Sequence, residues 1–212
     1  MGSDQQGLSG ARDRYAAAAR AFAELVGRIP ADRWDGPGLG DWDLRALVGH
    51  TSRSLTTVNT YLRSPATRED VPDAVAYYLW VRRYLASADG AEVVERGRAA
   101  GRELGEDPAG AVGALVDRVL GELAAVDTDR LITVIAGQGM RVSAYLPTRV
   151  FELVVHGLDI ARAAQLPFDP PAEALAEAAA LAARVGVAAG QGAELLMALT
   201  GRAPLPPAFS VV

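Results

Sequence analysis

Cysteine is absent from the 212-residue sequence, and histidine occurs only twice. Without cysteine the chain can form no disulfide, no thiolate metal site and no cysteine nucleophile, so thiol chemistry would need a thiol from outside the chain. Lysine is absent as well, and all 21 basic residues are arginine, which we attribute to coding bias rather than to function. The formal net charge of -5 gives no electrostatic footprint for nucleic acid or an anionic membrane.

Long apolar runs are missing too. No run approaches the roughly 18 apolar residues of a membrane helix, and the polar residues 1–15 lack the apolar core of a signal peptide. We therefore expect a cytoplasmic protein, monomeric or homodimeric, that binds neither membranes nor nucleic acids. β-Branched runs are few and alanine is abundant, a composition that favours helices.

Apolar residues recur at helical spacing along most of the chain. Glycines at positions 90, 97 and 101 suggest a break or bend in the second half of one long helical region. The spacing predicts helices over residues 8–28, 41–63, 71–104, 108–123, 147–165, 172–189 and 194–200.

Local signals set the expected ends of these elements. Asp41 is expected to be the N-cap of the second helix, with Trp42 at its first position. The one strand signal, Leu131 to Tyr145, predicts a hairpin around a Gly-Gln-Gly turn at 137–139. Pro147 is then expected to begin the next helix.

A glutamate and a histidine lie one turn apart in that helix. Glu152 and His156 share a helical face, and their neighbours in the sequence are mostly apolar. An ionised carboxylate costs several kcal/mol in an apolar setting unless it is paired or bound to a metal. If Glu152 is buried and ionised, its carboxylate must therefore be paired with another group or bound to a metal.

The other histidine, His50, lies beside the apolar stripe of the second helix. Ser54, Thr57 and Tyr61 follow it at helical steps. Such a polar stripe is expected on a helix that lines a pocket, and equally at the boundary between a buried and a solvated face.

Two histidines and one carboxylate are a common ligand set for a catalytic divalent metal with an open coordination position. Facing helices of a bundle can supply such ligands. The alternative for each residue is an ordinary hydrogen-bonded, partly buried side chain. Spacing alone does not establish that the two helices face each other.

Two segments resemble the mycothiol-dependent maleylpyruvate isomerase branch of the DinB-like metalloprotein superfamily. The first is GDWDLRALVGHT at residues 40–51, and the second is the pattern RxxExxxHGLD at residues 149–159. The ending LLMALTGR at residues 195–202 is also similar to endings in this group. The resemblance spans nearly the whole chain.

The resemblance implies a mostly α fold, an up-and-down four-helix bundle with a short β-hairpin. It also implies that His50, Glu152 and His156 hold a divalent metal, most commonly zinc. We expect the bundle in residues 1–165 and a short helical C-terminal extension, packed on the bundle, in residues 166–212. By comparison with the isomerases, this C-terminal part is shortened to about two helices and a tail.

The activity implied is that of a metal-dependent and mycothiol-dependent isomerase, or of a thiol S-transferase, acting on a small maleylpyruvate-like electrophile. The chemistry agrees with the composition, because a metal with an open position can lower the pKa of a thiol, and the chain has no thiol of its own. Asp159 is a candidate for orienting a ligand imidazole, or an ordinary exposed aspartate. Arg149 is a candidate for binding a substrate carboxylate, or pairs with a nearby acid.

Two further functions stay open on the sequence. A metal-dependent hydrolase would need a separate general base, and none is obvious. A DinB-like binding or stress-response module would keep the fold without catalysis, but it would have no need for an intact ligand set.

Overall fold

A computed structural model describes residues 2–85 and 90–212 of the chain. Within these ranges the chain is mostly helical, with one short antiparallel hairpin. The helices are α1 (Gly2–Gly27), α2 (Leu44–Tyr61), α3 (Ala74–Leu85), α4 (Gly90–Glu103), α5 (Pro108–Ala124), α6 (Val142–Ala164), α7 (Ala172–Ala188) and α8 (Gly192–Leu199), the strands are β1 (Leu131–Thr133) and β2 (Gly139–Arg141), and single 3-10 turns are η1 (Ala31–Arg33) and η2 (Ile135–Gly137).

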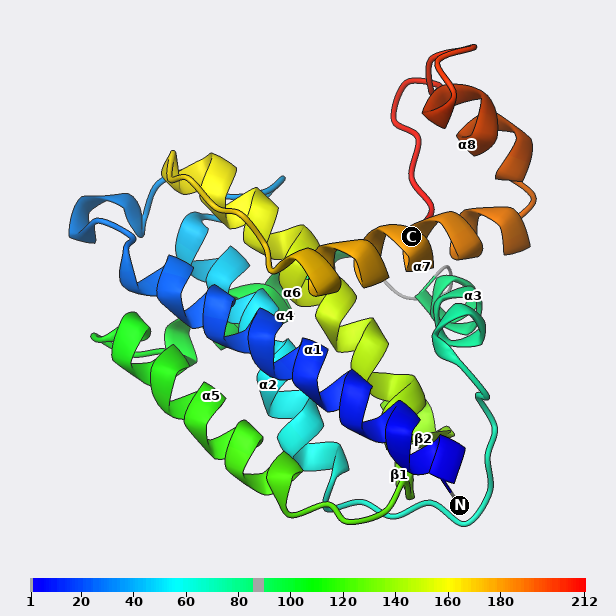
Figure 1. Ribbon diagram of the computed structural model, residues 1–212. Helices are drawn as coiled ribbons and strands as arrows, with labels where there is room; N and C mark the ends of the chain where they lie inside the picture. The colour runs from blue at the N-terminus through cyan, green and yellow to red at the C-terminus, as the bar shows by residue number, and fades with distance from the viewer. Residues whose placement is uncertain (1, 86–89) are drawn as a thin grey trace.

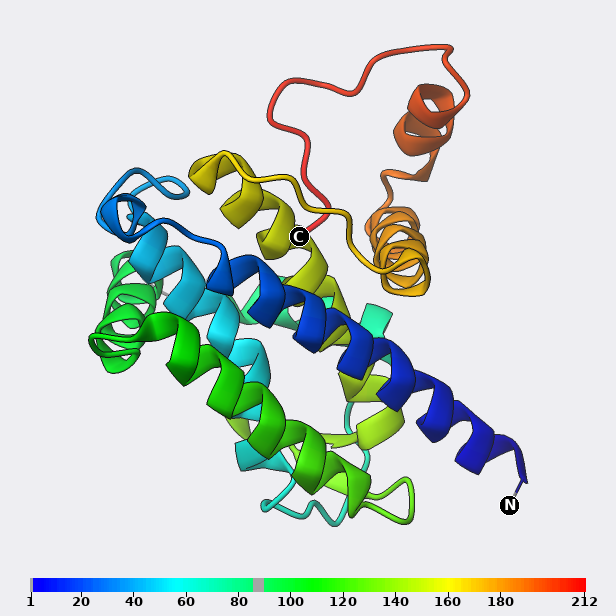
Figure 2. The same cartoon turned by 60° about the vertical axis from the view of Figure 1, so that its left-hand side comes forward.

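Four helices form the bundle. Helices α1 and α2 each pack against both α5 and α6, so the four enclose one core (Figures 1 and 2). The core is filled by fully buried large side chains, among them Phe22, Leu47 and Leu153. The predicted helical bundle with a short β-hairpin is confirmed.

The start of α2 differs from the prediction. Asp43, not Asp41, is the N-cap, and its carboxylate accepts a hydrogen bond from the Ala46 backbone N–H at 2.7 Å. Trp42 lies outside the helix because its N–H closes a turn onto the Leu39 carbonyl at 3.0 Å. The helix therefore begins at Leu44, two residues later than the sequence pattern indicated.

The start of α6 was also predicted wrongly. The helix begins at Val142, directly after β2, and Pro147 lies inside it. Asp129 explains the early start, since its carboxylate accepts hydrogen bonds from both the backbone N–H and the hydroxyl of Ser143. The first of these bonds satisfies a backbone N–H of the first turn, which has no partner within the helix.

Of the three glycines that suggested a break or bend, Gly90 begins α4, whereas the other two lie inside that helix. The predicted long helical region is divided into α3 and α4, and the chain between them, 86–89, lies outside the described residues. Gly97 and Gly101 lie within α4, where the helix crosses α2. A Cβ on Gly97 would approach the Trp42 indole to 2.6 Å, and one on Gly49 would overlap the Gly101 backbone. The glycines thus allow α2 and α4 to pack closely.

The C-terminal helices lie beside the bundle. Helix α7 packs on α6 and α3, and α8 packs on α7, with no buried residue of its own (Figure 1, orange to red). We propose that residues 166–212 form an extension on the bundle of residues 1–165. Among the described helices none is both long and apolar enough to cross a membrane.

Candidate metal centre

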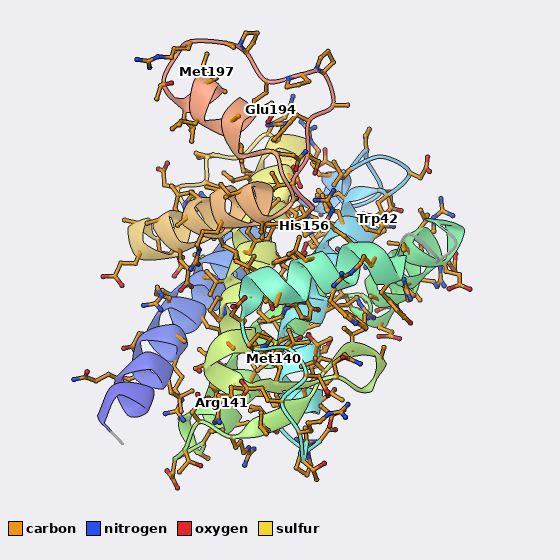
Figure 3. All side chains as sticks on the ribbon, turned by 90° about the vertical axis from the view of Figure 1, so that its right-hand side faces the viewer. Trp42, Met140, Arg141, His156, Glu194 and Met197 are labelled. Atoms are coloured by element: carbon orange, nitrogen blue, oxygen red, sulfur yellow. The ribbon has the colours of Figure 1, made fainter. Side chains whose placement is uncertain are left out.

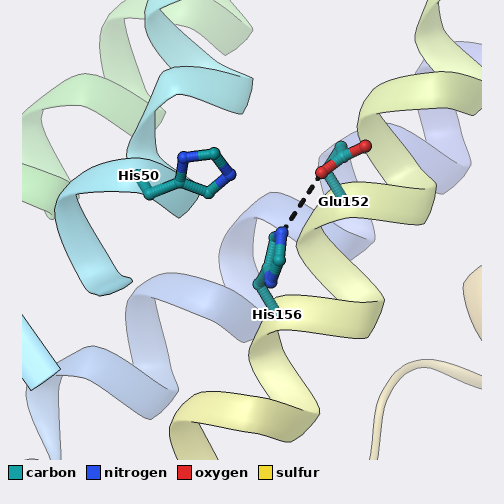
Figure 4. A group of neighbouring side chains, drawn as sticks. All are labelled: His50, Glu152 and His156. Atoms are coloured by element: carbon teal, nitrogen blue, oxygen red, sulfur yellow. Dashed lines mark ion pairs between the residues drawn. The ribbon is translucent and has the colours of Figure 1, made fainter. Parts of the chain in front are cut away.

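The three candidate ligands converge between α2 and α6. His50 comes from α2, and Glu152 and His156 come from consecutive turns of α6 (Figure 4). One potential ligand atom from each lies within 4.8 Å of the other two. The centre lies toward the end of the bundle away from the hairpin, and Figure 3 shows His156 near Trp42 and distant from Met140 and Arg141. The convergence, which spacing did not establish, follows from the packing of α2 against α6.

Glu152 is the negative member of the centre. Its Oε2 lies 3.3 Å from His156 Nε2, and its Oε1 accepts a hydrogen bond from the Tyr78 hydroxyl at 2.7 Å. Burial opposes ionisation, but the hydrogen bond from His156 and the positive charge of Arg149 lower the pKa of Glu152 to about 2. The carboxylate is therefore ionised at neutral pH.

His156 is held between two carboxylates. Its Nδ1 lies 3.2 Å from Asp159 Oδ2, and its Nε2 faces Glu152. Burial lowers the pKa of His156, but the bonds to Asp159 and Glu152 outweigh it and raise the pKa to about 9. Asp159 thus occupies the position expected of a residue that orients a ligand imidazole.

His50 has a different environment. Its ring packs against the Trp42 indole, with ring centroids 4.4 Å apart, and the indole N–H donates to the Val94 carbonyl of α4 at 2.9 Å. Burial, and then the positive charge of His156, lower the pKa of His50 to about 4. Its Nδ1 is buried and has no hydrogen-bond partner among the described residues. Ring packing rather than a carboxylate therefore fixes this imidazole.

The polar stripe beside His50 contacts α6. Ser54 is 2% exposed, and the Thr57 hydroxyl accepts a hydrogen bond from the Tyr145 hydroxyl at 2.9 Å. Tyr61 packs on the Tyr145 ring at 5.5 Å. The stripe is a partly buried seam between α2 and α6, because Ser54 is buried whereas His50, Thr57 and Tyr61 are half-buried.

Arg149 lies one turn before Glu152 and is only 9% exposed. Its Nε donates to the Thr148 hydroxyl at 3.0 Å, and its guanidinium lies over the Tyr77 and Tyr145 rings at 5.6 and 5.0 Å. No acidic side chain within the described ranges forms an ion pair with it. Glu152, one turn along α6, interacts with Arg149 at longer range, since the charge of Arg149 lowers the pKa of Glu152.

Two contributors to the centre were not identified in the sequence. Tyr78 belongs to an aromatic cluster that pattern alone assigns to the core, and it is 74 residues from Glu152. Trp42 was expected to be only the first residue of a helix. No local signal connects either side chain with the ligands, although Trp42 lies within the first resembling segment.

The donor set suits a divalent ion of the zinc type. Such ions bind imidazole nitrogen and carboxylate oxygen, and three protein ligands leave a position for water or substrate. The charged Glu152 and neutral His50 are already in the protonation states that a metal requires, and only His156 would have to lose a proton. The residues therefore fit such an ion.

Comparison with known proteins gives one match. A family model described as "Mycothiol maleylpyruvate isomerase N-terminal domain" matches residues 15–161, a range that contains all three candidate ligands. No curated protein and no solved structure matches the chain. The match covers more than half of the sequence, and the chain belongs to the mycothiol maleylpyruvate isomerase N-terminal domain family.

Proposed function

We propose that this protein is a metal-dependent enzyme that uses mycothiol to isomerise a small electrophile or to transfer a thiol to it. The observation that carries the proposal is the convergence of His50, Glu152 and His156 from two helices of the bundle. Family membership supports the choice of thiol. The absence of cysteine supports it as well, because the sulfur must come from a cofactor.

The metal would be held by those three side chains. When bound with an open position, a divalent metal lowers the pKa of a thiol and favours the nucleophilic thiolate. If the thiol adds across the double bond of the electrophile and is then released after rotation about the resulting single bond, the product is an isomer. If the thiol is retained, the product is a thioether, so one site serves both activities.

The surrounding residues would hold the ligands in position. Asp159 accepts the Nδ1 proton of His156, which leaves Nε2 directed at the centre. Tyr78 occupies one oxygen of Glu152 and leaves the other facing His156. Trp42 restricts the His50 ring. Each ligand thus has one contact that limits its rotation, which lowers the entropy lost on metal binding.

Elemental analysis of the purified full-length chain tests the proposal. We expect about one zinc or similar ion per chain in the wild type, and loss of that metal in His50→Ala and Glu152→Ala. Glu95→Ala is the matched control, because Glu95 is exposed and pairs with Arg102 at the surface. Absence of metal from the wild type, even after reloading with zinc, would contradict the proposal and favour a binding module.

A second assay separates the two chemical outcomes. Metal-loaded protein is incubated with mycothiol and a maleylpyruvate-like electrophile, and the products are examined by mass spectrometry and NMR. An isomer of unchanged mass indicates isomerase activity, and a product heavier by one thiol indicates S-transferase activity. Hydrolysis products that form without any thiol would contradict both.

A further inference from the structure

A cavity lies between α2, α4 and α5, on a different side of α2 from the metal centre. Helices α4 and α5 both pack on α2, and the cavity has a volume of about 320 Å³. Of the described residues that line it, none is a candidate metal ligand. The volume lies within the range of small-molecule binding sites in proteins. The cavity is thus large enough for a ligand and separate from the metal centre.

Small side chains leave this space open. The apolar part of the lining consists mainly of glycine and alanine, with two leucines beside them: Gly49, Ala100, Leu104, Ala111, Ala114 and Leu115. Protein interiors contain few voids larger than a water molecule, and an unfilled cavity lowers stability as its volume grows. A space of this size that no side chain fills therefore indicates a place for a ligand with an apolar body.

Charged side chains complete the lining. Arg53 of α2 and Arg118 of α5 are exposed, and neither guanidinium forms a hydrogen bond or an ion pair with another described residue. Glu103, at the end of α4, also has no ion pair within the described ranges. Two arginines and one glutamate give the lining a net charge of +1. The apolar surface and the excess positive charge are together complementary to an amphipathic anion.

We propose that this cavity binds a small amphipathic anion. Its apolar body lies among the alanines and leucines, and its carboxylate or phosphate group lies between Arg53 and Arg118. Arginine binds both head groups through charge-assisted hydrogen bonds, and burial of the apolar body supplies the rest of the affinity. The site does not depend on the proposed function, because its lining contains none of the three candidate ligands.

Calorimetric titration of the full-length chain with octanoate and with octyl phosphate tests the site. Octanamide is the uncharged probe with the same apolar chain as octanoate, and acetate is the anion without that chain. We expect the better of the two amphipathic anions to bind at least about tenfold more tightly than octanamide or acetate, and its identity assigns the head group. Equal binding of octanamide or of acetate, or no binding of either amphipathic anion, would overturn the proposal.

Charge variants are expected to shift the affinity in opposite directions. Arg118→Gln should weaken octanoate binding about fivefold, whereas Glu103→Gln should strengthen it about twofold because it removes a competing carboxylate. Arg20→Gln, at an exposed position on α1 outside the cavity, is the matched control and should bind as the wild type does. Shifts of the same sign in Arg118→Gln and Glu103→Gln would contradict the proposed electrostatics, since a purely structural effect has no dependence on charge.

A volume variant tests the position of the apolar body. Ala114→Leu places a larger side chain in the cavity from an exposed position of α5 and should weaken octanoate binding about tenfold. Leu199→Ser is the control for unspecific adsorption, because Leu199 is an apolar residue of α8 that is 76% exposed. Unchanged binding in Ala114→Leu, or loss of binding in Leu199→Ser, would overturn the site.

Binding at the metal centre gives a different pattern. A carboxylate can also coordinate zinc, so the titration is repeated on Glu152→Ala, which lacks a proposed metal ligand and leaves the lining of the cavity intact. Binding that persists in Glu152→Ala and weakens on adding Arg118→Gln supports the cavity, even if the wild type binds no zinc. Binding that is lost in Glu152→Ala and is unaffected by Arg118→Gln refutes the cavity and leaves the proposed function standing.

Discussion

Metal binding to the Glu152–His156 pair is expected to release one proton at neutral pH. The charged His156 carries one proton on Nδ1, facing Asp159, and one on Nε2, facing Glu152. The metal must take the place of the proton on Nε2. With a pKa of about 9, His156 is almost fully protonated at pH 7, whereas His50, with a pKa of about 4, is neutral. Glu152, with a pKa of about 2, is already ionised. One proton per metal ion therefore leaves at pH 7.

The same proton sets the pH dependence of affinity. Well below the pKa of His156, each unit of pH changes the apparent metal dissociation constant about tenfold. At pH 9 half of His156 is still protonated, so zinc should bind about 50-fold more tightly at pH 9 than at pH 7. Isothermal titration calorimetry in buffers of different ionisation enthalpy counts the protons directly. Chelator competition, corrected for zinc hydrolysis, gives the affinities.

A variant identifies the source of the proton. Asp159→Asn removes one of the two carboxylates that raise the pKa of His156, so that fewer protons should leave at pH 7 and the affinity should level off at a lower pH. Glu95→Gln, at an exposed surface ion pair, should leave both quantities unchanged. No proton release by the wild type at pH 7 would refute the charged His156 on which the reasoning depends.

Three further predictions concern stability and metal affinity. Gly49→Ala should lower the free energy of unfolding by about 1–3 kcal/mol, measured by urea denaturation, because its Cβ would overlap the Gly101 backbone; unchanged stability would contradict the close crossing of α2 and α4. Tyr78→Phe should weaken zinc binding about tenfold, measured by chelator competition, because Glu152 loses a hydrogen-bond donor; unchanged affinity would mean that Tyr78 does not orient the ligand. In metal-free protein the raised pKa of His156 adds about 3 kcal/mol to the free energy of unfolding. This contribution is fully present below pH 6.5 and is lost as the pH rises through 9. Thermal melts should show the loss in the wild type but not in His156→Gln.

The two errors at helix ends have one physical cause. Asp41 and Asp43 are equally good caps by residue type, and only the turn from Leu39 to Trp42 leaves Asp43 to bind the Ala46 N–H. The early start of α6 likewise depends on Asp129, which lies on the other side of the hairpin, just before β1. Contacts from outside the helix decided both ends.

The sequence by itself determined the properties that depend on residue type and helical spacing. These are the helical bundle with its hairpin, the absence of any thiol from the chain, and the two α6 residues that share one face. His50 was identified because the chain has only one other histidine. Glu152 and His156 lie one turn apart on any helix, so their proximity needs no tertiary information.

Only the tertiary structure decided what surrounds these residues. The approach of His50 to the α6 pair, the contact of Tyr78 with Glu152 and the packing of Trp42 on His50 all join segments that are distant in sequence. Such contacts depend on how helices cross, which local periodicity does not encode. The surroundings of Arg149 were equally invisible, because the ring of Tyr77, which lies over its guanidinium together with that of Tyr145, comes from a distant part of the chain.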